Sequence, residues 1–86
     1  MKASILIVED EALIADDIAN TLEKNGYRIT DIVDNAEDAL EACTREKPDV
    51  ALLDINIKGD MDGLELAPLL KLPFIFLTSY YDQHTL

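Results

Sequence analysis

The chain has 86 residues, of which 49% are hydrophobic and 29% are charged, so it fits one small folded domain better than a disordered chain or two domains. Its formal net charge of −11 disfavours direct binding of this segment to nucleic-acid phosphates and favours a cation as ligand. With a single cysteine, no long apolar stretch and no secretory signal, we expect a cytoplasmic protein without a membrane segment.

The first half of the chain alternates between strand and helix patterns. Residues 4–9 form a short β-branched run, which is typical of a strand buried on both faces of a parallel sheet. Apolar residues then recur at helical spacing over residues 11–25, where an Asn-Gly pair indicates the end of the helix. Residues 27–33 mix polar and apolar side chains, as expected for a strand near the edge of a sheet.

The second half continues the alternation. A helix capped by Asn35 is predicted to run to about residue 46, and a strand follows over residues 49–54. Residues 64–70 predict a third helix, which should be short or irregular because Pro68 lacks a backbone hydrogen-bond donor.

The last predicted elements are a strand over residues 73–78 and a helix that begins at about residue 82. Strand and helix in strict alternation, with right-handed crossovers, predict an α/β fold with a doubly wound parallel sheet. Ligands of such sheets bind beyond the carboxyl ends of the strands. The residues expected there are Glu9, Asp10, Asp54, Ile55, Asn56, Thr78 and Ser79.

Three of these residues, Glu9, Asp10 and Asp54, carry carboxylates that converge if their strands are neighbours. Carboxylates this close raise one another's pKa unless a cation intervenes, and hard oxygen ligands open to water suit Mg²⁺. An aspartate beside Mg²⁺ can attack phosphorus and form an acyl phosphate. The Thr78 hydroxyl could then bind a phosphoryl oxygen, and Ser79 is small enough to leave the approach open.

Four motifs in combination resemble the receiver domain of two-component response regulators. They are the acidic pair Glu9-Asp10 after "ILIV", Asp54 at the end of "VALLD", "MDG" at 61–63 and "FLTS" at 76–79. The resemblance spans the whole chain as one domain, residues 1–86. It implies a flavodoxin-like fold with strand order 2-1-3-4.

The resemblance also implies a function. Asp54 would accept a phosphoryl group from the phosphohistidine of a sensor histidine kinase or phosphotransfer protein. Mg²⁺ would bind Asp10, Asp54 and the backbone carbonyl of Asn56, with Glu9 assisting through water. Thr78 would move towards the phosphate and switch contacts with partners or with an output domain. Such a domain is not an enzyme in the ordinary sense, because it catalyses only its own phosphorylation and dephosphorylation.

The sequence departs from the family pattern near its end. Receivers carry a lysine after a fifth strand and then a fifth helix, whereas here Lys58 lies in a loop and Lys71 at a helix end. The sequence thus resembles a receiver truncated before the fifth strand, and we expect slower phosphoryl capture. We also expect self-association through the apolar fourth strand or through the first helix, with exchange of elements between chains as one route.

Other functions compete with this interpretation. Mg²⁺-dependent phosphatases of the haloacid dehalogenase class also use a strand-end aspartate, but they place a second aspartate two residues later, where this chain has Asn56. A nucleotide-binding or flavin-binding module would need a glycine-rich first loop, and "VEDEALIA" has no glycine. An inert receiver-like interaction module is the third alternative.

Single residues also have plainer explanations. The pair Glu9-Asp10 could serve only to favour the start of a helix, and Asp54 could close a strand as a turn residue. Gly59 and Gly63 are interpreted as turn glycines.

Overall fold

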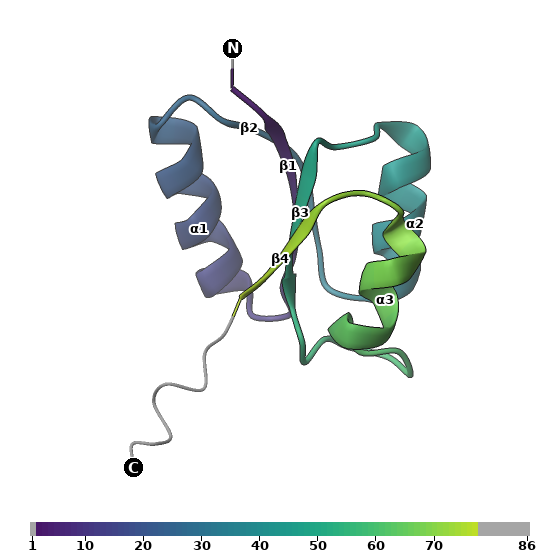
Figure 1. The fold of residues 1–86 in the computed structure, drawn as a ribbon. Coiled ribbons are helices and arrows are strands. Elements are labelled where there is room, and N and C mark those ends of the chain that lie inside the picture. The colour runs from purple at the N-terminus through teal and green to yellow at the C-terminus, as the bar shows by residue number, and fades with distance from the viewer. Residues whose placement is uncertain (1, 78–86) are drawn as a thin grey trace.

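A computed structural model describes residues 2–77, which form one parallel sheet of four strands in the order β2-β1-β3-β4 with three helices (Figure 1). The elements are β1 (Ser4–Val8), α1 (Ala12–Lys24), β2 (Arg28–Val33), α2 (Ala36–Arg45), β3 (Val50–Asp54), α3 (Gly63–Leu70) and β4 (Phe74–Leu77). The predicted α/β class, the parallel sheet and the strand order are confirmed. The helix expected from about residue 82 lies outside the described residues.

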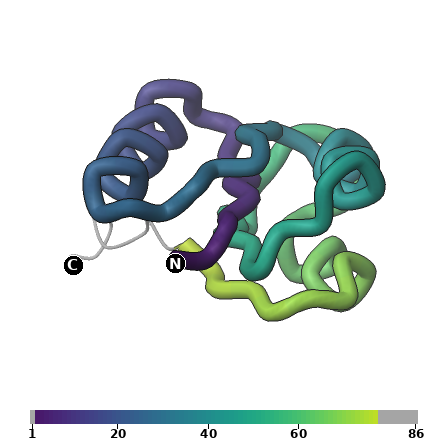
Figure 2. Tube along the Cα trace, turned by 90° about the horizontal axis from the view of Figure 1, so that it is seen from above, coloured from purple at the N-terminus to yellow at the C-terminus, as the bar shows by residue number. Residues whose placement is uncertain are grey.

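The helices cover both faces of the sheet, with α1 on one face and α2 and α3 on the other (Figure 2). Successive side chains of a strand point to opposite faces, so β1 supplies both halves of the core. Ile5 and Ile7 pack with the alanines of α1, whereas Leu6 and Val8 pack with α2, α3 and β3. Burial on both faces explains why β1 is apolar without alternation.

Local signals set the ends of the first two helices. The helix α1 ends at Lys24, where Asn25 is the C-cap and Gly26 takes a left-handed φ of 91°. Asn35 caps α2, because its side-chain oxygen accepts a hydrogen bond of 2.8 Å from the Asp38 amide, as predicted. At the other end of α1, the N-cap is Glu11, and its side chain makes no capping hydrogen bond.

The third helix is short, as predicted, and it runs through Pro68, which lies inside the predicted range of residues 64–70. Asp62 and Glu65 form a capping box at its start, in which each side chain bonds the other residue's backbone amide. Leu66 and Leu70 are buried on either side of the proline. Packing of this apolar face and the strong N-terminal cap therefore offset the hydrogen bond that proline cannot make. No helix of residues 2–77 has the length and apolar character needed to cross a membrane.

The two edges of the sheet differ in chemistry. The edge strand β2 carries the charged residues Arg28 and Asp31, and its register with β1 shifts between Ile5 and Leu6. The strand β4 is wholly apolar, with Phe74 40% and Ile75 58% exposed. Within residues 2–77, β4 pairs with β3 on one side and with no strand on the other.

Candidate functional site

The carboxyl ends of β1 and β3 bring three acidic side chains together. The two strands are parallel neighbours in which Val8 pairs with Leu53, so the residues that follow emerge side by side. One carboxylate oxygen from each of Glu9, Asp10 and Asp54 lies within 4.8 Å of the others. The convergence expected from the sequence is confirmed, and it follows directly from the strand order.

Backbone amides orient two of these carboxylates. Glu9 is only 4% exposed, and its Oε2 accepts a hydrogen bond of 3.0 Å from the Glu11 amide. Asp54 is 8% exposed, and its Oδ1 accepts one of 3.2 Å from the Asn56 amide. Asp10 is half-buried and opens the cluster towards solvent. The buried pair is thus held in place while one side remains accessible.

The cluster is electrostatically costly without a cation. Burial raises the pKa of Glu9 from 4.5 to about 7; the Glu11 amide opposes this rise, and Asp54 and Asp10 add to it. At neutral pH, the Glu9 carboxyl is therefore partly protonated in the absence of a counter-ion. A divalent cation among the three carboxylates would favour the ionised form and lower this pKa.

The donor set fits Mg²⁺ better than a softer metal. All three side chains offer carboxylate oxygens, which are hard ligands, and the open side at Asp10 leaves room for the waters that Mg²⁺ retains. The backbone amide of Asn56 donates a hydrogen bond to Asp54. A metal-binding role of the backbone carbonyl of Asn56 stays a prediction. Thr78 and Ser79 lie outside the described residues, so their expected roles also stay predictions.

Gly63 supports the site in a way that differs from the prediction of a turn glycine. A Cβ at this position would lie 2.2 Å from the carbonyl oxygen of Asp54 and 2.9 Å from the Cα of Ile55. The Gly63 amide also donates a hydrogen bond of 2.7 Å to the Ile55 carbonyl. Glycine is needed because α3 begins directly against the backbone that carries Asp54. Gly59, with a φ of 92°, is a turn glycine as expected.

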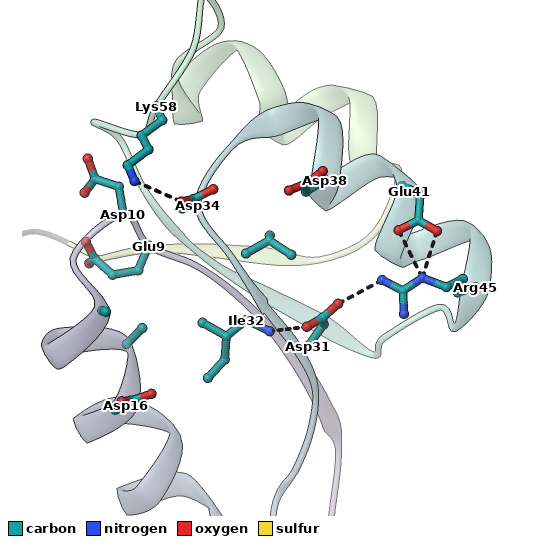
Figure 3. Close-up of a pocket in the computed structure, with 13 residues that line it drawn as sticks. Glu9, Asp10, Asp16, Asp31, Ile32, Asp34, Asp38, Glu41, Arg45 and Lys58 are labelled. Atoms are coloured by element: carbon teal, nitrogen blue, oxygen red, sulfur yellow. Dashed lines mark hydrogen bonds and ion pairs between the residues drawn. The ribbon is translucent and has the colours of Figure 1, made fainter.

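A cavity of about 620 Å³ opens beside the acidic cluster, between α1, β2 and α2 (Figure 3). Glu9 and Asp10 line one side of it, and Lys58 reaches over it from the β3–α3 loop. The Lys58 ammonium lies 3.1 Å from an oxygen of Asp34. The sequence pattern indicates a loop position for Lys58 and no role in the site. Its separation of four residues from Asp54 is the signal that could have drawn attention to it.

The model of the response regulator receiver domain family matches residues 5–86. The sensory transduction protein LytT of Bacillus anthracis is 38% identical over 87 residues, which cover 95% of this chain and 35% of that protein. The transcriptional regulatory protein YvrH of Bacillus subtilis is 41% identical over 81 residues, which cover 90% of this chain and 34% of that protein. The chain thus spans about a third of the length of these relatives.

The fold is also similar to that of solved structures. The signal receiver domain of a modulated diguanylate cyclase from Desulfovibrio desulfuricans G20 superposes with a TM-score of 0.85 at 40% identity, over 98% of this chain and 70% of that chain. The anti-anti-sigma factor PhyR from Bartonella quintana superposes with a TM-score of 0.84 at 27% identity, over 93% of this chain and 34% of that chain.

Proposed function

The chain belongs to the response regulator receiver family, and from that premise we propose that it is a phosphoacceptor domain whose Asp54 takes a phosphoryl group from a sensor histidine kinase or phosphotransfer protein. The observation that carries this proposal is the convergence of Glu9, Asp10 and Asp54 within 4.8 Å. A strand-end aspartate alone could close a turn, but three converging carboxylates, two of them buried, have a cost that a bound cation offsets.

The carboxylate of Asp54 is the proposed nucleophile. The Asn56 amide binds its Oδ1 and so fixes the orientation of the carboxylate. One Asp54 oxygen forms a bond to phosphorus, while the bond from phosphorus to the donor's histidine nitrogen breaks and the imidazole keeps the electron pair. Asp10, Asp54 and the Asn56 carbonyl would hold Mg²⁺, with Glu9 assisting through water. When bound, Mg²⁺ offsets negative charge on the transferred group.

The proposed consequence is a change of contacts around β4. Thr78 follows this strand directly and would move towards the phosphoryl group, with the small Ser79 leaving the approach open. Contacts with partners or with an output domain would change as a result. Because the relatives are about three times as long as the matched region, the output of the complete protein is a separate proposal, and transcriptional regulation is one candidate in view of the YvrH similarity.

A phosphatase of the haloacid dehalogenase class remains the enzyme alternative. Such an enzyme needs a general acid two residues after the nucleophile, and the Asn56 amide cannot deliver a proton. An assay with a generic phosphate ester separates the two functions, because a receiver gives stoichiometric labelling and a phosphatase gives many turnovers. An inert interaction module is disfavoured because the chain retains all three acidic residues.

Labelling by acetyl phosphate tests the proposal. We expect about one phosphoryl group per chain in the presence of Mg²⁺, none after chelation and none in Asp54→Asn. Asp60→Asn is the matched control, because Asp60 is an exposed aspartate of the β3–α3 loop and its loss should leave labelling unchanged. Beryllofluoride binding should show the same dependence on Mg²⁺ and Asp54. Retention of the label by Asp54→Asn would contradict the proposal.

A further inference from the structure

The β3–α3 loop is fastened to the β2–α2 loop through Lys58. The Lys58 amide donates a hydrogen bond of 3.0 Å to the Asp34 carbonyl, and the Lys58 ammonium pairs with the Asp34 carboxylate at 3.1 Å. Asn35 and Lys58 also form a short parallel bridge of the β type. We refer to these contacts of Lys58 with Asp34 and Asn35 as the Lys58 clasp.

The Asp34 side of the clasp is itself fixed. The Asn35 side-chain amide donates a hydrogen bond of 2.8 Å to Asp34 Oδ1, and Asn35 is the residue that caps α2. Hydrogen bonds from Asn35 and Lys58 hold the pKa of the Asp34 carboxyl below its usual value, so this group is ionised at neutral pH. The clasp therefore ties the β3–α3 loop to the start of a packed helix.

Asn56 lies halfway between two anchored residues. Two positions before it, Asp54 is buried at the end of β3, and two positions after it Lys58 is held by the clasp. Beyond the clasp, Gly59 turns the chain with a φ of 92°, and a Cβ there would have no heavy atom within 4 Å. The clasp thus fixes the segment that contains Asn56, and the exposed residues Gly59 and Asp60 follow it.

We propose that Lys58 is a positioning residue for the metal site: the clasp fixes the β3–α3 loop so that the Asn56 carbonyl stays in place to bind the divalent ion. This inference rests on the proposed function, because it assumes that the acidic cluster binds Mg²⁺. Lys58 itself touches neither the ion nor the phosphoryl group in this proposal. Its contribution is the geometry of a ligand, as for other groups that orient metal ligands.

A charge effect of Lys58 on the site would have the opposite sign. Lys58 lines the same cavity as Glu9 and Asp10, and a positive charge there repels a divalent cation (Figure 3). If charge were its only influence, removing the ammonium would strengthen Mg²⁺ binding. If the ion pair of the clasp helps to position the loop, removing the ammonium weakens Mg²⁺ binding, even though the backbone hydrogen bond from Lys58 to Asp34 remains. The direction of the change therefore distinguishes the two effects.

Mg²⁺ titration by calorimetry tests the proposal on the wild-type chain and on Lys58→Met, Lys58→Arg and Lys47→Met. We expect Lys58→Met to bind Mg²⁺ about two- to fivefold more weakly, as loss of an exposed ion pair that orients a ligand would give. Lys58→Arg keeps a cation in reach of Asp34 and should retain most of the affinity. Lys47→Met makes the same charge change at an exposed position before β3 and should have no effect.

A second measurement needs no metal. Amide hydrogen exchange of Asn56 in metal-free protein should be faster in Lys58→Met than in the wild type or Lys58→Arg, because the clasp limits motion of this loop. Equal or tighter Mg²⁺ binding by Lys58→Met, with unchanged exchange at Asn56, would overturn the proposal. A wild-type chain that binds no Mg²⁺ would instead overturn the proposed function, and the exchange comparison would still decide whether Lys58 fixes the loop.

Discussion

At the scale of single residues, Glu9 links the site to pH. Its pKa in the folded chain is about 7, above the ordinary value of 4.5, so folding takes up a proton between these two values. In the absence of a divalent cation, the contribution of Glu9 to the free energy of unfolding therefore falls as pH rises from about 4.5 to about 7. Above this window, the charged carboxyl is buried beside Asp54 and Asp10 at full cost.

Glu9→Gln should make this cost visible. At about pH 8 without Mg²⁺, the variant should be more stable than the wild type by on the order of 2 kcal/mol, and at about pH 5 the two should be nearly equal. Urea unfolding at both pH values measures the difference. Asp34 and Asp49 have lowered pKa values, so their contributions to the free energy of unfolding change with pH in the opposite direction. These contributions are the same in both proteins and cancel in the comparison. A difference in the free energy of unfolding between the two proteins that grows towards low pH would contradict this prediction.

The sequence predicted the acidic residues of the site but not the residues that support them. Parallel strands end at one edge of the sheet, so Glu9, Asp10 and Asp54 were expected together if β1 and β3 were neighbours, and the family resemblance supplied that strand order. The clasp of Lys58 depends on where two loops lie in space, and sequence spacing carries no such information. The role of Gly63 depends on a close approach between backbones, which a glycine in a turn-like sequence does not reveal.

At the scale of elements, the start of α3 is fixed by its contact with the end of β3. Replacing a helical glycine by alanine usually stabilises a protein by up to about 1 kcal/mol. At Gly63, the added Cβ would lie 2.2 Å from the Asp54 carbonyl oxygen. Because this oxygen is a backbone atom, relieving the clash requires a shift of α3 or of the end of β3. We expect Gly63→Ala to lower the free energy of unfolding by about 1 to 3 kcal/mol and to weaken Mg²⁺ binding. Urea unfolding and Mg²⁺ titration measure the two effects.

The control for this prediction is the next residue of α3. Leu64→Ala changes an exposed side chain in the same helical turn and should shift stability by no more than about 0.5 kcal/mol. If Gly63→Ala were as stable as the wild type, the contact between α3 and the Asp54 backbone would not constrain the chain.

The elements were predictable to different degrees. The strands β1 and β3 are buried apolar runs, so composition alone indicated them. The helix α3 was predicted over residues 64–70, but Pro68 suggested a short or irregular helix, and its regular course depends on the capping box and the buried leucines. The capping box is a local signal in the sequence, whereas the burial of the leucines comes from tertiary packing, which the local sequence does not contain.

At the scale of the whole molecule, the two edge strands of the sheet differ in how readily they would pair with a second chain. The charges and the register shift of β2 discourage strand addition, whereas the apolar β4 leaves its outer backbone groups without a partner strand in residues 2–77. Leu13, on α1, is 85% exposed and offers a second apolar contact. The net charge of −11 opposes self-association, so salt should promote it by screening.

Ile75→Lys tests association through β4. Ile75 is 58% exposed, and a lysine there places a charge on the open edge, so the variant should be monomeric where the wild type forms dimers at high concentration and salt. Sedimentation velocity over a concentration series measures the dimer fraction. Leu69→Lys makes the same kind of change on the exposed surface of α3 and should leave the dimer fraction unchanged. If only Leu13→Lys abolished the dimers, the contact would lie on α1 and not on β4. A wild-type chain that stays monomeric throughout the series would show that charge repulsion outweighs the apolar edge.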